Sequence, residues 1–191
     1  MTPQSICVFS SSSAAVAPAF FEAARELGTQ IAQHGHTLVY GGARVGLMGE
    51  LARAVQAQHG KVIGVIPEHF RIRGLAYDMA DELIVTSDLR ERKAVMETRS
   101  DAFVALPGGF GTLEEVSEVI TLKQLQYHAK PVVFVNTLHF YDELLALYDH
   151  FFSLHFAKEQ HHQLFKAVPD AEAALEYIDQ YYPPIPESKW Y

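Results

Sequence analysis

The chain has 191 residues, of which 49% are hydrophobic and 20% charged, a composition typical of a soluble globular domain. Its 23 acidic and 15 basic residues give a net charge of −8, which argues against nucleic acid as the main partner. The single cysteine, Cys7, excludes an internal disulfide. The sequence shows neither a basic leader nor an apolar run of about 18 residues, so we expect no signal peptide and no membrane partner. We therefore expect one cytoplasmic domain over residues 1–191.

Short apolar runs alternate with stretches of helical spacing along the chain. The predicted strands are residues 5–10, 37–40, 62–66, 83–85, 102–106 and 131–135. The predicted helices begin at Pro18, after the glycines of 41–49, at Ser87 or Asp88, at Thr112 and at Tyr141. We expect residues 68–80 to form a loop or irregular helix. The remainder is predicted to be helical, most clearly over 171–181, and to end in a short tail rich in proline and aromatic residues.

This alternation predicts a parallel α/β sheet with helices on both faces, a doubly wound, three-layer α/β/α domain. Right-handed crossovers place every loop from a strand to a helix at the same edge of the sheet. The unusual loops are all of this kind: 10–13, 41–49, 86–93 and 107–112. Ligands in open α/β sheets bind at that edge, so we expect these loops to converge on one cleft.

The most distinctive stretch runs from Asp101 to Glu115, with the sequence DAFVALPGGFGTLEE. It predicts a buried strand, a glycine loop and a helix N-terminus, where free N–H groups and the helix dipole suit a phosphate. The candidate phosphate ligands are Gly108, Gly109, Gly111 and Thr112. A simpler interpretation stays open, in which the glycines only make the turn and Thr112 and Glu115 form a capping box. The loop matches neither the P-loop nor the dinucleotide fingerprint.

Charged residues close to this loop in the predicted cleft indicate a phosphorylated substrate that carries a sugar. Arg92 offers a planar cationic fork for an anion, or alternatively pairs with Asp88 four residues earlier. Lys93 is its neighbour in the same charged stretch. Glu115 is placed to hold ribose hydroxyls and to stabilise an oxocarbenium ion. Asp101 either orients Arg92 or ends the preceding helix region.

The ten histidines raise the question of a metal. No H-E-x-x-H motif is present, and the pairs His34/His36 and His161/His162 are expected in surface turns. We therefore expect no metal site. The chain has no G-x-S-x-G elbow and Cys7 lies within a strand, which argues against a serine or cysteine nucleophile.

Four segments together resemble the LONELY GUY family, over about residues 4 to 155. They are 41–49 (GGARVGLMG), 62–67 (VIGVIP), 91–93 (ERK) and 107–115 (PGGFGTLEE). The resemblance implies a Rossmann-like fold, a homodimer and no cofactor. It also implies hydrolysis of cytokinin riboside 5′-monophosphates, which are N6-modified adenosine 5′-monophosphates, to free base and ribose 5-phosphate.

By position, the family's catalytic arginine and glutamate fall on Arg92 and Glu115. The remaining residues implied to contact substrate or phosphate are Ser11, Gly42, Met48, Lys93, Gly108, Gly109, Gly111 and Thr112.

Two departures from the family pattern concern the pocket. Ser11 stands where the family usually has glycine, and Ala43 replaces a common third glycine. Ser11 adds a side chain where the backbone approaches the nucleotide, so the preferred base stays open between an N6-modified adenine and another purine. Two other functions also stay open: a non-catalytic nucleotide-binding or carrier module, and an assembly surface formed with the C-terminal tail.

Overall fold

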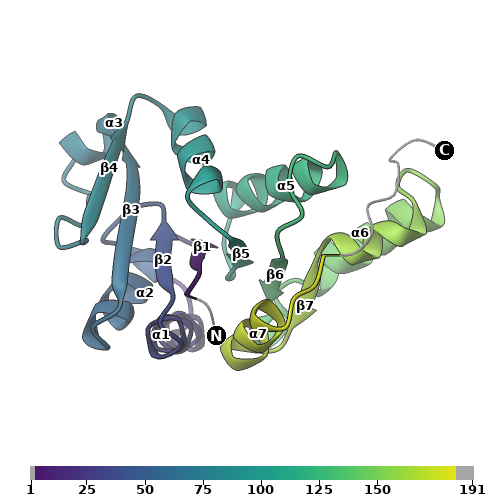
Figure 1. The fold of residues 1–191 in the computed structure, drawn as a ribbon, viewed down its shortest axis with the longest axis horizontal. Coiled ribbons are helices and arrows are strands. Elements are labelled where there is room, and N and C mark those ends of the chain that lie inside the picture. The colour runs from purple at the N-terminus through teal and green to yellow at the C-terminus, as the bar shows by residue number, and fades with distance from the viewer. Residues whose placement is uncertain (1–2, 184–191) are drawn as a thin grey trace.

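The computed structural model describes residues 3–183, which form seven strands and the helices around them (Figure 1). The strands are β1 (Ser5–Phe9), β2 (Thr37–Tyr40), β3 (Lys61–Pro67), β4 (Glu82–Thr86), β5 (Ala102–Ala105), β6 (Val132–Val135) and β7 (Lys166–Val168). The α-helices are α1 (Pro18–Gln33), α2 (Gly46–Ala57), α3 (Glu68–Ile72), α4 (Leu89–Thr98), α5 (Phe110–Gln124), α6 (Asp142–Ser153) and α7 (Ala171–Asp179). Two 3₁₀ helices, η1 (Thr137–His139) and η2 (Glu159–Leu164), flank α6.

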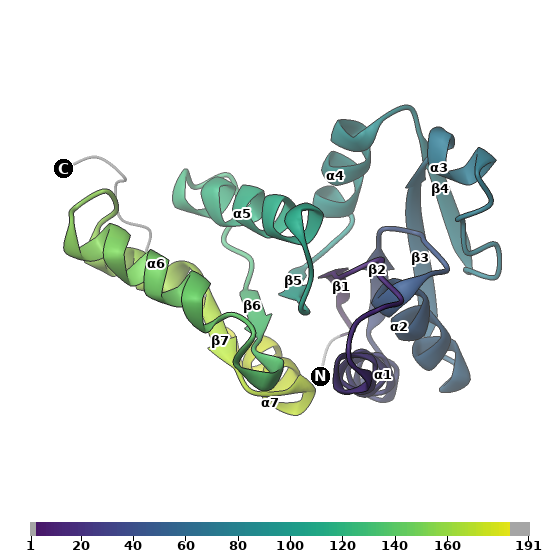
Figure 2. The ribbon, with the colours of Figure 1, turned by 180° about the vertical axis from the view of Figure 1, so that it is seen from behind.

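All seven strands run parallel, in the order β4-β3-β2-β1-β5-β6-β7. The central strand β1 is buried on both faces: Ile6 and Val8 pack with α1, α2 and α7, while Cys7 and Phe9 pack with residues of α4 and α5. Figure 2 shows the same two helix layers from behind. The predicted doubly wound, three-layer α/β/α fold is confirmed. Within residues 3–183, none of the helices combines the length and the apolar character that crossing a bilayer requires.

Several element predictions were wrong in detail. The last strand, β7, was predicted as part of a helical remainder; it has only three residues, too few to show a period, and pairs with the end of β6. Residues 68–80, predicted as a loop or irregular helix, do contain the short helix α3 followed by a loop. Helix α5 has its N-cap at Gly109, three residues before the N-cap predicted at Thr112. Most of the predicted proline- and aromatic-rich tail lies outside the described residues.

Candidate active site

The order of the strands creates the site. From β1 the chain proceeds outward through β2, β3 and β4, then returns to β5 on the other side of β1 and proceeds outward through β6 and β7. A cleft of about 490 Å³ lies at the edge where the strands lead into their helices, lined by the loops that follow β1 to β5 and by the helix starts there. The predicted convergence of loops at one edge is confirmed, and it falls where open α/β sheets bind ligands.

One side of the cleft is the start of α5, which follows the glycine loop (residues 107–112). Gly109 is the N-cap, and no side chain of the described residues caps this end. The N–H groups of the first helical turn have no carbonyl partner within the helix, so they are available to an anion in the cleft. The predicted capping box is wrong, because Thr112 lies inside the helix and Glu115 pairs with another residue. Gly109, Gly111 and Thr112 line the cleft.

Arg92 of α4 and Glu115 of α5 form a largely buried ion pair in the cleft. Arg92 Nη1 lies 2.9 Å from Glu115 Oε1, and the two side chains are only 12% and 9% exposed. Arg92 Nε also donates a hydrogen bond of 3.2 Å to the carbonyl of Val65 at the end of β3. A Cβ on Gly41 would lie 2.1 Å from Arg92 Nη2, so only glycine leaves room for the guanidinium there. The Arg92–Glu115 pair is therefore held between the ends of β2 and β3 and the helices α4 and α5.

Burial raises the pKa of Glu115 above its ordinary value, and the positive charge of Arg92 opposes that rise. The carboxyl group is therefore poised to take up a proton more readily than an exposed glutamate. Because Arg92 stays charged and lies within hydrogen-bond distance, it favours the carboxylate form of Glu115.

The alternatives for the neighbouring acids are settled by their contacts. Asp88 caps α4 by accepting hydrogen bonds from the N–H groups of Arg90 and Glu91, at 2.8 and 2.9 Å, so the alternative pairing with Arg92 is wrong. Asp101 Oδ2 accepts a 2.8 Å hydrogen bond from the N–H of Ser5. Asp101 therefore tethers the start of β1 instead of orienting Arg92.

The other residues implied to bind substrate fall into two groups. Ser11 and Met48 line the cleft, and the Ser11 carbonyl accepts a 2.9 Å hydrogen bond from the N–H of Leu47 at the start of α2. Gly42 and Gly108 lie behind the lining, in positions where a Cβ would collide with Ile66 and Thr112 respectively.

The side chain of Lys93 points away from the cleft. Its Nζ forms ion pairs with Glu114 and Glu118 on α5, the second at 2.8 Å, and it is absent from the cleft lining. Its contacts join α4 to α5.

One wall of the cleft was not anticipated from the sequence. Phe70 and Leu75, from the stretch predicted as irregular, line it together with Leu89 and Phe110 at the starts of α4 and α5. The N–H of Arg44 donates 2.9 Å to the carbonyl of Leu75, which holds this stretch against the loop after β2. The apolar residues were visible in the sequence, but nothing local predicted that they would fold back over the cleft.

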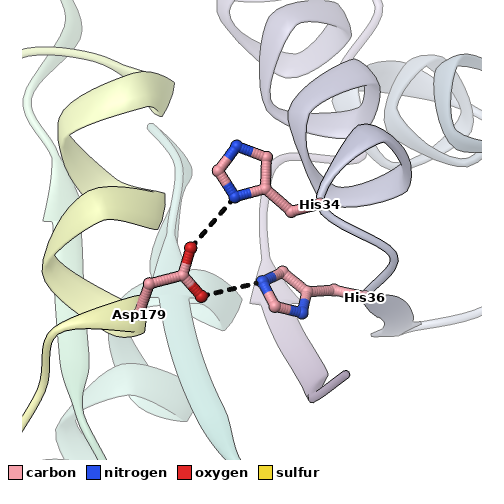
Figure 3. Close-up of side chains that lie close together, drawn as sticks. All are labelled: His34, His36 and Asp179. Atoms are coloured by element: carbon pink, nitrogen blue, oxygen red, sulfur yellow. Dashed lines mark hydrogen bonds and ion pairs between the residues drawn. The ribbon is translucent and has the colours of Figure 1, made fainter. Parts of the chain in front are cut away.

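A second cluster of chemically active side chains lies outside the cleft (Figure 3). Asp179 of α7 contacts His34 Nδ1 at 3.0 Å and His36 Nε2 at 3.2 Å. The prediction that the pairs His34/His36 and His161/His162 lie in surface turns is wrong for His36 and His161, which are 1% and 7% exposed. His36 Nδ1 accepts a hydrogen bond from the N–H of Gln4, so the ring proton is on Nε2 and is donated to Asp179. To bind a metal through Nε2, His36 would need that nitrogen to be unprotonated, with the ring proton on Nδ1. The cluster joins α7 to the segment between α1 and β2 by hydrogen bonds.

Comparisons with known proteins identify the family of this chain. Residues 48–178 match a family model described as "possible lysine decarboxylase". A rice (Oryza sativa subsp. japonica) protein named probable cytokinin riboside 5′-monophosphate phosphoribohydrolase LOGL9 is 44% identical over 178 residues, covering 93% of this chain and 78% of the rice protein. Arabidopsis thaliana LOG7, of the same named activity, is 38% identical over 182 residues, covering 95% of this chain and 84% of the relative.

Solved structures extend the fold comparison. The molybdenum cofactor carrier protein of Chlamydomonas reinhardtii superimposes with a TM-score of 0.72 at 28% identity, covering 94% of this chain and 98% of the carrier. The family model matches most of the chain, and the named relatives match nearly all of it. The chain belongs to the LONELY GUY (LOG) family, whose named relatives here are cytokinin riboside 5′-monophosphate phosphoribohydrolases.

Proposed function

We propose that this protein hydrolyses the N-glycosidic bond of adenosine 5′-monophosphates, including N6-modified ones, and releases the free base and ribose 5-phosphate. The observation that supports this most directly is the buried Arg92–Glu115 pair, which shares one cleft with the uncapped start of α5. The α5 N-terminus would bind the 5′-phosphate, which sets the ribose beside the carboxylate. The relatives named for this activity support the same reaction.

The chemistry follows from the two charges. As the bond from C1′ to the base breaks, its electron pair leaves with the base and positive charge develops on the ribose. The Glu115 carboxylate stabilises that charge and takes a proton from the water that attacks C1′. The departing base takes a proton from solvent water, and Glu115 returns the proton that it removed to the solvent, so the proton count balances. Arg92 keeps Glu115 ionised in a buried place and holds its orientation.

The apolar wall of the cleft, which includes Phe70 and Leu75, suits the base and a hydrocarbon substituent on it. The cleft lining of the described residues contains no lysine, the residue that would form a Schiff base with pyridoxal phosphate. We therefore propose the glycosidase and not a decarboxylase, in spite of the description that the family model bears.

We also propose a cytoplasmic homodimer. Three apolar side chains lie exposed beside the cleft mouth on α4 and α5: Leu89 at 50%, Phe110 at 93% and Leu113 at 38%. Exposed apolar groups that cluster in this way are typical of an interface. The single cysteine is free and buried, as expected in a reducing compartment.

The proposal is tested by incubating the purified protein separately with AMP and with isopentenyladenosine 5′-monophosphate, and separating the products by chromatography. We expect free base and ribose 5-phosphate in equal amounts, and the ratio of the two rates gives the preferred base. Thermal protection by both nucleotides without any release of base would instead identify a binding module, as the carrier-protein fold allows.

A further inference from the structure

One buried hydrogen bond connects the glycine loop to a residue that does not line the cleft. The hydroxyl of Tyr141, which precedes α6, donates to the carbonyl of Leu106 at 2.7 Å. Tyr141 is 4% exposed and Leu106 is fully buried. Leu106 stands between the end of β5 and Pro107, the first residue of the glycine loop.

The position of this hydrogen bond allows it to orient the Leu106–Pro107 peptide unit. Proline has no N–H, so the peptide unit between Leu106 and Pro107 can be oriented by hydrogen bonding only through the Leu106 carbonyl. In the described part of the chain, Tyr141 supplies that bond. The orientation of the peptide unit on which the glycine loop begins therefore depends on a tyrosine from another element.

Tyr141 is itself held firmly. Its N–H donates to Asn136 Oδ1 at 2.7 Å, and Asn136 Nδ2 donates to Asp142 Oδ1 at 2.7 Å. The ring packs edge-on against Phe134 of β6, with centroids 4.9 Å apart. A side chain fixed at both its backbone and its ring keeps its hydroxyl in one place.

The first glycine of the loop packs closely against the first turn of α5. A Cβ on Gly108 would lie 2.1 Å from Thr112 Oγ1, which shows how closely the loop packs on the first turn of α5. Thr112 is only 4% exposed. A tilt of the peptide before Pro107 is therefore passed on to the N–H groups at the start of α5.

We infer that Tyr141 is a positioning residue for phosphate binding: its hydroxyl sets the orientation of the glycine loop and so aims the α5 N–H groups at the 5′-phosphate. This inference rests on the proposed function, because it assigns the phosphate to that helix start. Tyr141 itself does not line the cleft or touch the reacting atoms.

The test is the conservative variant Tyr141→Phe, which keeps the ring contacts and removes only the hydroxyl. Its matched control is Tyr148→Phe, in which a tyrosine of α6 whose ring centroid lies 6.4 Å from that of the same Phe134 loses its hydroxyl. Calorimetric titration with ribose 5-phosphate and steady-state hydrolysis of AMP are measured for the wild type and both variants, with circular dichroism and thermal melting to establish folding.

For Tyr141→Phe we expect ribose 5-phosphate affinity to fall, and KM to rise, by about fivefold, the scale of one net hydrogen bond. We expect kcat to stay near the wild-type value, because the loop holds the phosphate equally in the ground and transition states. Tyr148→Phe should bind like the wild type. Should Tyr141→Phe prove unstable, Asn136→Ala, which releases the Tyr141 backbone, is expected to raise KM in the same way.

Wild-type affinity and KM in a folded Tyr141→Phe would overturn the inference, as would equal losses in Tyr141→Phe and Tyr148→Phe, or a fall confined to kcat. A different result would overturn the proposed function itself. A wild-type protein that neither binds ribose 5-phosphate nor cleaves AMP would overturn the proposed function, and the inference with it.

Discussion

At the scale of single residues, Glu115 has a neighbour that makes a close control. Glu115 is buried beside Arg92, whereas Glu114 is 58% exposed in its side chain and faces Lys93. We expect Glu115→Gln to lower the rate of base release about 100-fold to 1,000-fold, because a neutral amide neither stabilises the oxocarbenium ion nor takes a proton from water. Glu114→Gln should retain nearly full activity. The rates of base release of both variants are measured by chromatography. Equal losses of rate in the two variants would contradict the catalytic role proposed for Glu115.

The pH dependence of the rate follows from the same residue. Desolvation raises the pKa of Glu115, and the charges of Arg92 and Glu114 act in opposite directions on it. Since the active form is the carboxylate, a raised pKa moves the loss of activity on acidification to a higher pH than an ordinary carboxyl group would give. Removing the negative charge in Glu114→Gln should shift that limb to lower pH. A kcat/KM profile whose acid limb coincides with an exposed carboxyl, at about 4.3, would contradict this prediction.

At the scale of elements, Lys93 connects α4 to α5 one residue beyond the Arg92–Glu115 pair. The carboxylates that it contacts are substantially exposed, at 58% and 43%, so each contact contributes at most about 1 kcal/mol to the free energy of unfolding. We expect Lys93→Met to change the KM for AMP less than twofold and to lower the melting temperature slightly. A rise in KM of about tenfold or more, measured by steady-state kinetics, would restore Lys93 to the phosphate-binding role that the family resemblance implied.

The sequence was most informative where local chemistry decides the element. The apolar run before Pro107 and the glycines after it predicted the strand and the turn, and the cap of α4 was predicted as Ser87 or Asp88, of which Asp88 is the one observed. It was least informative where a distant segment decides the outcome. His36 is buried because Asp179, 143 residues away, accepts its proton, and β7 is a strand because β6 offers it a free edge. Phe70 and Leu75 lack a period of their own, so only the folded chain places them in the cleft.

At the scale of the whole molecule, the apolar side chains at the cleft mouth give a test of the proposed dimer. Leu113 is 38% exposed near the start of α5 and does not line the cleft, whereas Tyr127, just beyond the other end of this helix, is 75% exposed. We expect the wild type to have twice the mass of one chain by size-exclusion chromatography with light scattering. Leu113→Asp should shift the mass to that of a monomer, because it buries a charge in the interface. Tyr127→Asp should leave a dimer, and a monomeric wild type would refute the proposal.

The cleft draws all its lining residues from the chain between Ser10 and Glu115. Among the described residues, those after α5, including α6, β7 and α7, extend and cover the sheet without entering the cleft. The two parts are therefore under different evolutionary constraints. The first must preserve the atoms that line the cleft, while the second must preserve the packing and the buried polar contacts, such as those of Asp179 and Tyr141, that hold the sheet together. We therefore expect homologues of this protein to tolerate more substitutions after about residue 125 than before it, and variation there would record selection on stability and assembly instead of on catalysis.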